Sequence, residues 1–467
     1  MRVLAVASEV FPLVKTGGLA DVAGALPAAL AREGIAVTTL LPGYPAVMAA
    51  LAGGEAALAI PDLFGGPARL LRAAHAGLDL LVLDAPHLFA RPGGPYAGPD
   101  GRDWGDNPLR FAAFAAAGAR AARDMAFDAV HAHDWQAGLL PAYLAAAGSG
   151  PRTLFTVHNL AFQGQFPAAL FPALGLPPAF LATEGAEYHG GVGYLKAGLW
   201  FAARLSTVSP GYAAEITTPE GGMGLDGLLR GRAAVLEGIA NGLDTAEWDP
   251  AADHRLPARF DARRLGRRAA NRAALRARFA LAEAEAPLIG FVGRLSWQKG
   301  VDLLLAALPV DAQLALLGSG EPGLEQAANA LAAANPGRVG VVLGYDEALA
   351  RLVYAGCDLF AMPSRFEPCG LGQLCALRYG APPVVSFAGG LADTVVNAND
   401  AALAMEAGTG FCCAPGSAPL LGAALRRAGA LWRDAPAWAA LQRRGMGQDL
   451  SWARPARRYA ATLRALA

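Results

Sequence analysis

The sequence contains little charge and no excess of either sign. Charged residues make up 17% of its 467 residues, and 39 Lys and Arg balance 39 Asp and Glu. Proteins that bind nucleic acid through its phosphates usually present a basic surface, so this balance argues against a nucleic-acid partner. Hydrophobic residues make up 54%, which also argues against a disordered chain. A neutral polymer or a small molecule is the better expectation for the ligand.

Cysteine is scarce, and long apolar runs are absent. The cysteines lie in the last third of the chain without C-x-x-C spacing, which argues against a zinc site or a disulfide framework and indicates reduced thiols in the cytoplasm. Arg, Asp, Gly or Pro interrupts each apolar stretch before it reaches membrane-spanning length, so we expect no membrane partner. The first apolar run, RVLAVAS, is too short for a secretory signal, and Glu9 follows it.

Two common metal-binding patterns are also missing from the sequence. It contains neither H-E-x-x-H nor D-x-D. His131, His133 and His158 lie around the ends of predicted strands, not on one helix face or at the spacing of a zinc finger. We therefore expect no metal site.

Strand-like and helix-like segments alternate along the chain. RVLAVAS, AVTTLLP, AVHAHD and RTLFTVHN read as strands buried on both faces, with Ala- and Leu-rich helical segments between many of them. Such alternation predicts parallel sheets with crossover helices, which is the α/β class. The pattern changes after IANGLDTAEWDP and restarts at PLIGFVGRL, and the length exceeds that of one ordinary core. We predict two doubly wound domains, residues 1–245 and 246–450.

Three loops after predicted strands carry residues suited to anions or sugars. Lys15 stands before Gly17 and Gly18 at the start of a helix, where glycine amides and a cation can hold a phosphate. A plain strand–helix turn with a solvated lysine fits that loop equally well. Arg294 and Lys299, in GRLSWQKG, could clamp a diphosphate, although such a pair taken alone is more typical of a solvent-exposed surface.

The third loop contains an acid beside glycines. In SRFEPCGLGQL, Glu367 precedes Gly370 and Gly372 at the predicted start of a helix. The acid could contact a ligand or simply cap the helix, because acids favour helix N-termini. A lone glutamate favours the cap.

The ordered combination of motifs is more specific than any one of them. K-T-G-G-L-A-D-V, H-A-H-D-W-Q-A-G-L, T-V-H-N-L-A-F-Q-G, N-G-L-D, G-R-L-S-W-Q-K-G and S-R-F-E-P-C-G-L-G-Q-L closely resemble the family of bacterial glycogen synthases and plant starch synthases. The resemblance covers essentially the whole chain. It implies a GT-B fold, with two Rossmann-like domains around a deep cleft. The first domain would lie on the acceptor side and be completed by a C-terminal helix in 451–467, and the second would bind a nucleotide sugar.

The resemblance also implies a reaction and a set of roles. The reaction is transfer of glucose from ADP-glucose to the non-reducing end of an α-1,4-glucan such as glycogen, with retention and without metal or cofactor. The implied catalytic residues are Lys15, His158, Arg294, Lys299 and Glu367. The implied substrate-binding residues are Gly17, Gly18, Asp21, Tyr96, Asn159, Asn241, Tyr345, Cys369, Gly370, Leu371 and Gly372. Among these, Tyr345 would stack on or near adenine.

Several positions depart from the family pattern, and two other functions stay open. Gly372 stands where threonine or asparagine is usual, Gln136 replaces a common histidine, and Phe162 replaces a common tyrosine. Cys375 stands where many retaining glycosyltransferases have a second glutamate. A UDP-glucose-dependent transferase would use the same phosphate-binding residues. A catalytically silent glucan-binding protein is the alternative outside the enzymes, although such a protein could lose Lys15 or Glu367 without cost.

Overall fold

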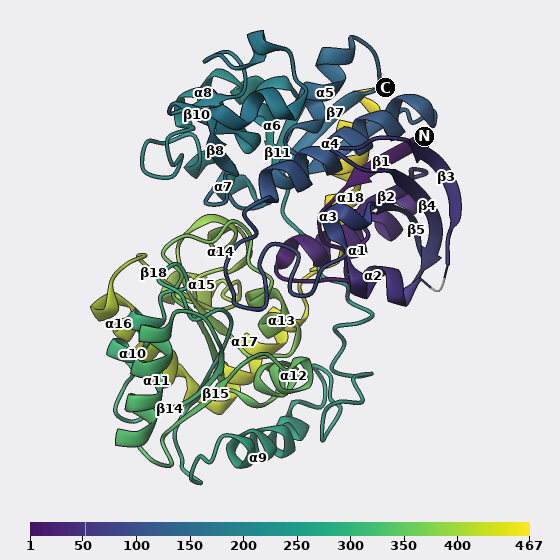
Figure 1. Ribbon diagram of the computed structural model, residues 1–467. Helices are drawn as coiled ribbons and strands as arrows, with labels where there is room; N and C mark the ends of the chain where they lie inside the picture. Colours follow the sequence, from purple (N-terminus) through teal and green to yellow (C-terminus); the bar gives the residue numbers. More distant parts are fainter. Residues whose placement is uncertain (52) are drawn as a thin grey trace. The chain divides into compact units, whose positions relative to one another are not determined.

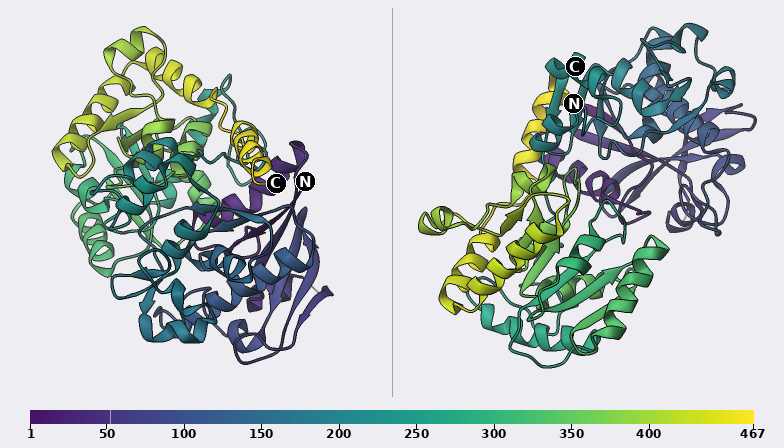
Figure 2. Two further views of the ribbon diagram at one scale, coloured as in Figure 1. Left: turned by 90° about the horizontal axis from the view of Figure 1, so that it is seen from above. Right: turned by 90° about the vertical axis from the view of Figure 1, so that its left-hand side faces the viewer.

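The computed structural model describes residues 1–51 and 53–467 (Figures 1 and 2). Contacts within the chain divide it into two compact units. Unit 1 contains Met1–Asn241 and Trp452–Ala467, and unit 2 contains Gly242–Ser451. The chain therefore leaves unit 1 after Asn241 and returns to it at Trp452. Which unit binds the acceptor and which binds the donor stays a prediction.

Unit 1 is built on a mostly parallel sheet with the strand order β12-β11-β7-β6-β1-β2-β5-β4-β3. The strands from β12 to β5 pair in parallel, and β4 and β3 extend the sheet as antiparallel edge strands. The central strands β1 and β6 are buried along almost their whole length, as strands covered on both faces must be. The strands are β1 (Arg2–Val6), β2 (Ala36–Pro42), β3 (Glu55–Ile60), β4 (Ala68–His75), β5 (Leu78–Asp84), β6 (Ala129–His133), β7 (Arg152–Val157), β11 (Arg204–Thr207) and β12 (Leu236–Gly238).

Helices and a small second sheet complete unit 1. The helices are α1 (Gly18–Arg32), α2 (Pro45–Ala50), α3 (Pro86–Phe89), α4 (Asn107–Asp124), α5 (Leu140–Ala147), α6 (Tyr194–Phe201), α7 (Pro210–Glu215), α8 (Asp226–Gly231) and α18 (Ala453–Arg464). The 3-10 turns are η1 (Trp135–Ala137), η2 (Ala168–Leu174), η3 (Pro178–Phe180) and η4 (Ala233–Val235). The small antiparallel sheet contains β8 (Gln165–Pro167), β10 (Gly191–Gly193) and β9 (Glu187–Tyr188).

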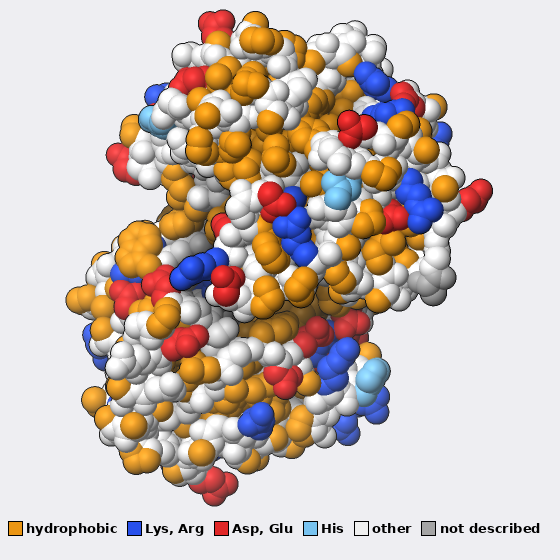
Figure 3. Space-filling view, viewed as in Figure 1, with side chains coloured by type: hydrophobic (Ala, Val, Ile, Leu, Met, Phe, Trp, Pro, Cys, Tyr) orange, Lys and Arg blue, Asp and Glu red, His pale blue; other side chains and the backbone are white. Residues whose placement is uncertain are grey.

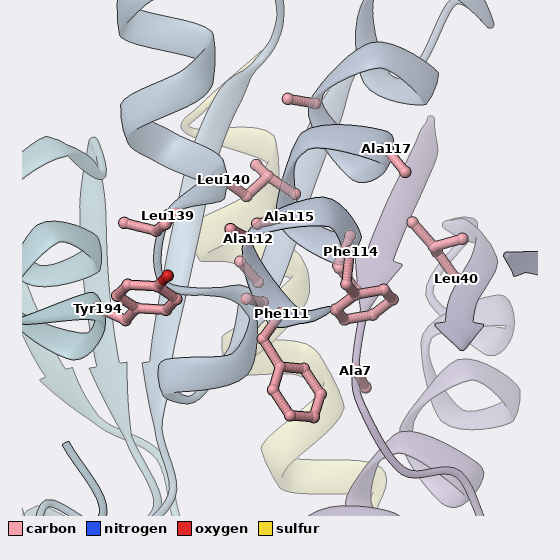
Figure 4. Close-up of a cluster of buried hydrophobic side chains, with 14 of the residues drawn as sticks. Ala7, Leu40, Phe111, Ala112, Phe114, Ala115, Ala117, Leu139, Leu140 and Tyr194 are labelled. Carbon is pink, nitrogen blue, oxygen red and sulfur yellow. The ribbon is translucent and has the colours of Figure 1, made fainter. Parts of the chain in front are cut away.

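The alanine-rich helix α4 shows why small residues suit this core. Figure 4 shows Phe111 and Phe114 of α4 in the same buried cluster as Leu40 of β2 and Leu140 of α5. At Gly118, also in α4, an added Cβ would lie 2.8 Å from a methyl carbon of Leu140. Small side chains on α4 therefore allow the helix to approach its neighbours closely, while two phenylalanines fill the remaining space.

Unit 2 has a fully parallel sheet with the order β15-β14-β13-β16-β17-β18. This is the 3-2-1-4-5-6 order of a Rossmann sheet. The strands are β13 (Leu288–Val292), β14 (Gln313–Gly318), β15 (Val339–Leu343), β16 (Leu359–Met362), β17 (Pro383–Ser386) and β18 (Phe411–Cys413). The helical segments are η5 (Leu265–Arg267), α9 (Arg268–Arg278), α10 (Val301–Ala307), α11 (Pro322–Ala334), α12 (Glu347–Gly356), α13 (Gly372–Arg378), α14 (Gly389–Thr394), α15 (Asp400–Ala404), α16 (Ala418–Trp432) and α17 (Ala435–Met446). The predicted α/β class and its two doubly wound halves are confirmed.

The surface agrees with the balanced composition. On the face shown in Figure 3, Lys and Arg side chains are interspersed with Asp and Glu side chains. Among the described residues, no helix combines the length and the apolar character that a membrane span requires.

Helix α18 belongs to unit 1 although it comes last in the sequence. It packs against α1, beside the N-terminal strand (Figure 2). Tyr459 and Leu463, four positions apart on one face of α18, are fully buried in a cluster with Val3, Val22 and Leu26. At its edge, Arg458 and Thr462 donate hydrogen bonds to Glu237. The returning helix thus closes a core that includes residues of β1 and α1 together with Ala129, Leu154 and Ile239.

We predict that Leu463→Ala destabilises unit 1 by about 2–5 kcal/mol, because it leaves a cavity in a fully buried position. Urea denaturation followed by tryptophan fluorescence measures the change. The matched control is Arg457→Ala on the exposed side of the same helix, which is expected to change stability by less than about 0.5 kcal/mol. Equal effects of the two variants would contradict the packing role of α18.

Candidate active site

Each main sheet has a switch point, where the order of successive strands across the sheet reverses. In unit 1, β1 lies between β2 and β6; in unit 2, β13 lies between β14 and β16. In open α/β sheets, ligands bind outside the carboxyl ends of the strands at such points. Lys15 follows β1, Arg294 and Lys299 follow β13, and Glu367 follows β16. The predicted catalytic residues named here therefore lie at the ligand-binding edges of their sheets.

Lys299 and Glu367 form a preformed ion pair in unit 2. Lys299 Nζ donates to Glu367 Oε2 at 2.6 Å, and Ser364 Oγ donates to the same oxygen at 2.9 Å. The Glu367 side chain is almost fully buried, whereas that of Lys299 is one quarter exposed. Helix α13 begins at Gly372 and has no side-chain cap, so the interpretation of Glu367 as a helix cap is wrong. The acid instead holds the ammonium of Lys299 in place.

The loops that follow β13 and β16 are fastened to one another. Arg365 makes a bidentate ion pair with Asp302, at 2.6 and 2.8 Å, and stacks on the ring of Trp297. Its guanidinium also donates to the Trp297 carbonyl at 2.6 Å. Gly300 has a φ of +66°, and a Cβ at this position would lie 2.1 Å from the carbonyl oxygen of Pro363. Only glycine allows this approach, which keeps Lys299 beside Glu367.

Residues 369–372 form the turn that leads into α13. Gln373 Nε2 donates to the carbonyls of Cys369 and Gly370, at 2.9 and 3.0 Å. Gly370 has a φ of +72°, which favours glycine. Leu371 is the N-cap residue, and Gly372 opens the helix. Gln373 therefore fixes the shape of the turn that carries the predicted substrate contacts.

Arg294 and Tyr345 extend the same edge of unit 2. Arg294 is exposed and, over the part of the chain that the structure describes, makes no ion pair. Tyr345 is 65% exposed in the loop after β15, on the far side of β14 from β13. The edge thus offers a cation near the switch point and an exposed aromatic ring farther along, an arrangement suited to the phosphates and base of a nucleotide.

In unit 1, a buried glutamate holds the loop between β1 and α1. Glu9 accepts hydrogen bonds from the amides of Thr16 and Gly17, the latter at 3.2 Å, and from Thr16 Oγ1 at 2.6 Å. Tyr96, from the loop before α4, donates its hydroxyl to Glu9 Oε1 at 2.5 Å. Lys15 Nζ pairs with Asp21 at 2.7 Å, and α1 begins at Gly18. Glu9 thus joins Thr16 and Gly17 of this loop to Tyr96, while Lys15 and Asp21 pair with each other.

Histidines from β6 and β7 lie against one another at the same edge. His133 Nδ1 and His158 Nε2 are 2.9 Å apart and share a hydrogen bond, and His131 Nε2 bonds Thr156 Oγ1 at 2.7 Å. Burial lowers the pKa of His131 and of His158 to about 3 and holds the pKa of His133 well below its ordinary value. These rings are therefore neutral near pH 7. Over the described residues, no group of three or more His, Cys, Asp and Glu side chains is arranged to hold a metal ion.

Asp134 fixes the backbone of His158. Its Oδ1 accepts from the His158 amide at 2.7 Å, and Asp134 itself has a φ of +54°, which a non-glycine residue rarely adopts. Burial raises the pKa of Asp134 to about 7, although hydrogen bonds from the amides of His158 and Asn159 oppose the shift. A strained, buried acid beside a strand end is typical of a functional site.

The remaining predicted residues of unit 1, Asn159 and Asn241, come after β7 and β12. Asn159 follows His158, and its Oδ1 accepts from the amide of Ala161 at 3.0 Å. Asn241 follows β12 and is buried, yet its Oδ1 has no hydrogen-bond partner among the described residues. A buried polar atom without a partner is costly, so the Asn241 amide is suited to bind a ligand.

Comparison with known proteins identifies the family. The model of the starch synthase catalytic domain matches residues 2–231, and that of the group 1 glycosyl transferases matches residues 275–435. The chain is 55% identical to the glycogen synthase of Rhodopseudomonas palustris (strain BisB18), over 99% of this chain and 97% of the relative. It is 56% identical to that of Acidiphilium cryptum (strain JF-5), over 100% and 99%. The chain belongs to the glycogen and starch synthase family.

A solved structure of this family agrees with the fold. The catalytic domain of starch synthase IV from Arabidopsis thaliana, bound to ADP and acarbose, matches with a TM-score of 0.88 and 31% identity over 99% of both chains. This chain accordingly has the GT-B fold. The protein is a glycosyltransferase that transfers a hexose. Its family uses a nucleotide-sugar donor and a glucan acceptor.

The departures from the glycogen synthase pattern have different structural settings. At Gly372, an added Cβ would lie 3.2 Å from both Met362 Sδ and a ring carbon of Phe360, so the local packing suits glycine. Cys375 is buried within α13, where its amide donates to the carbonyl of Leu371 at 3.0 Å. Gln136 is buried, and its Oε1 lacks a partner among the described residues, whereas Phe162 is 47% exposed.

Sequence reasoning missed four residues that fix the loops at the strand ends of the two sheets. They are Glu9, Asp134, Gln373 and Arg365. Glu9 and Asp134 stand directly after predicted buried strands, and that position in an α/β sheet was a usable signal. Gln373 and Arg365 act through long-range contacts, and nothing in their local sequence indicates them.

We predict that unit 1 loses stability as the pH falls from 6.5 toward 4. The unfolded chain binds protons on His131, His133 and His158 in this range, whereas the folded chain keeps them neutral, so each contributes up to about 1.4 kcal/mol per pH unit. Asp134 acts in the opposite direction between pH 7 and about 4, because its raised pKa lets the folded state bind the extra proton. The net slope corresponds to about two protons.

Urea denaturation at several pH values measures this slope. His131→Asn is expected to reduce it by about one proton, and Asp134→Asn to increase it by about one, since asparagine can still accept from the His158 amide. Changes of the same sign in the two variants would contradict the assignment.

Proposed function

We propose that the protein transfers glucose from ADP-glucose to the non-reducing end of an α-1,4-glucan, with retention of configuration and without a metal. The observation that carries this proposal is the Lys299–Glu367 ion pair at the switch point of unit 2, beside the exposed Arg294. Cations fixed at this edge suit a diphosphate leaving group, because they lie where negative charge develops. We further infer that it acts in the cytoplasm. In support, the cysteines form no disulfide among the described residues.

In this proposal, each unit supplies part of the site. From unit 2, Arg294 and Lys299 neutralise the diphosphate, Glu367 binds glucose hydroxyls, and Tyr345 stacks near adenine. From unit 1, Lys15 and the amide of Gly18 approach the phosphates and the sugar. His158 lies against the glucose, with its ring neutral, and Asn241 offers its unpartnered amide oxygen.

Same-face substitution explains retention better than a double displacement does. A retaining glycosidase uses a carboxylate nucleophile and a second carboxyl group about 5–5.5 Å away. Glu367 is engaged by Lys299 and Ser364, and Glu9 by the amides before α1, so neither carboxylate is placed as a nucleophile. The bond from the anomeric carbon to the phosphate oxygen breaks, and the acceptor hydroxyl bonds to that carbon on the face just vacated. The departing phosphate takes the hydroxyl proton.

Two alternatives are kept because specific observations bear on them. A UDP-glucose donor would meet the same cations, but the related starch synthase IV structure contains ADP, which favours adenine. A silent glucan-binding protein would not need the Lys299–Glu367 pair, so the intact pair favours an enzyme.

The first prediction of this proposal concerns the donor. Glucose from radiolabelled ADP-glucose is expected to enter glycogen with EDTA present, and UDP-glucose is expected to be a much poorer donor. The measurement is precipitation and counting of labelled glucan. Transfer from UDP-glucose alone would overturn the donor, a need for added metal would overturn the metal-free mechanism, and no transfer at all would favour the silent binding protein.

The second prediction concerns the cations. Lys299→Ala and Arg294→Ala are each expected to lower kcat by about 10²–10³, because each removes one contact to the leaving group. Arg278→Ala, an exposed arginine at the end of α9, is the matched control and is expected to keep normal turnover. Steady-state kinetics with saturating glycogen measure both, and near-normal kcat for Lys299→Ala would refute its role.

A further inference from the structure

The Glu9 carboxylate is buried and, among the described residues, forms no ion pair with a lysine or an arginine. Its residue is only 3% exposed. Its carboxylate accepts hydrogen bonds from the loop that follows it in the sequence and from one tyrosine. The donors are the amides of Thr16 and Gly17, the hydroxyl of Thr16 and the hydroxyl of Tyr96. Backbone amides that converge on one carboxylate form the kind of anion-binding concavity that elsewhere holds a phosphate. Here the protein's own acid fills it.

This arrangement restricts how the loop can bind a donor. The amides of Thr16 and Gly17 point at Glu9, so they are already committed. Lys15 Nζ pairs with Asp21 at 2.7 Å, and the amides from Gly18 onward belong to the first turn of α1, where a helix N-terminus favours an anion. The Gly17 amide donates to Glu9 at 3.2 Å, and its contact with the donor stays a prediction.

A second loop is tied to the same carboxylate. Arg110 of α4 is fully buried and donates to the carbonyls of Leu88 and Pro95, at 2.8 and 3.1 Å, so it holds the segment that carries Tyr96. Tyr96 also bonds Ser8 Oγ at 2.8 Å. Glu9 therefore joins the loop after β1 to the loop before α4, and both carry predicted substrate contacts.

We propose that Glu9 is a positioning residue that sets the donor-binding shape of the loop Lys15–Gly18. It acts through the Thr16 and Gly17 amides and does not touch the substrate. This inference rests on the proposed function, because the loop matters only if it binds the donor. It adds a specific division of labour: the carboxylate shapes the loop, and Lys15 with the first amides of α1 meets the phosphates.

The test compares Glu9→Met with Glu9→Gln. Methionine keeps the length of the side chain but has no strong acceptor, whereas the glutamine carbonyl can still accept from both amides and its amide group can donate to Thr16 and Tyr96 hydroxyls. We expect Glu9→Met to raise the KM for ADP-glucose about tenfold or more, as for loss of charge-assisted hydrogen bonds, with the KM for glycogen changed less than about twofold. Glu9→Gln is expected to restore most of the donor affinity.

Hydrogen exchange supplies a readout that does not depend on turnover. In Glu9→Met, the amides of Thr16 and Gly17 are expected to exchange at least about tenfold faster, while those of β1 and β6 keep their protection. Glu237→Gln is the matched control, because it alters a carboxylate that joins β12 to α18 and has no contact with this loop. It is expected to leave the donor KM and the exchange at 16–17 unchanged.

The outcomes separate this inference from the proposed function. If the wild-type protein transfers no glucose, the proposed function fails, and the exchange experiment still tests the loop. Unchanged donor KM and unchanged exchange in Glu9→Met would overturn the inference, as would a general loss of protection without a selective rise in donor KM. If Glu9→Met does not fold, Thr16→Val removes only the hydroxyl bond, and a rise of about threefold in donor KM is expected; no rise overturns the inference.

Discussion

Parallel pairing of the central strands brings their carboxyl ends to one edge of each sheet. These strands are β6, β1 and β2 in unit 1 and β14, β13 and β16 in unit 2. The strand order then reverses at β1 and at β13, so the loops that follow diverge and leave a place for a ligand. Lys15, Arg294 and Glu367 follow β1, β13 and β16, and His158 follows β7, the parallel neighbour of β6. The pairing of the strands thus decides where chemistry can occur before any side chain is considered.

The loops at these edges lack the repeating backbone hydrogen bonds of helices and strands. Specific side chains bond their amides and carbonyls instead. Glu9 and Asp134 accept from amides in unit 1, and Gln373 donates to carbonyls in unit 2. Arg365 binds both a carbonyl and an acid. Buried backbone groups must be satisfied, so a loop with such a partner has one favoured shape. The same polar contacts that stabilise the loops therefore prepare them for substrate.

The sequence allowed the α/β class to be predicted, because buried strands alternate with helical segments at spacings that local patterns reveal. It also indicated Lys299 and Glu367 as candidates, but not that they form a pair, since 68 residues separate them along the chain. The same limit explains the wrong interpretation of Glu367 as a helix cap: an acid near a helix start favours that role until its distant partner is known. The commitment of the Gly17 amide to Glu9 was equally hidden, because a glycine pair before a helix looks the same with or without an internal acid.

Helix α18 has a consequence for how the protein is made. The ribosome synthesises Val3, Val22 and Leu26 early, but Tyr459 and Leu463, which share their core, emerge only after the whole of unit 2. The core that Tyr459 and Leu463 share with α1 is therefore completed only when the last segment of the chain has been synthesised.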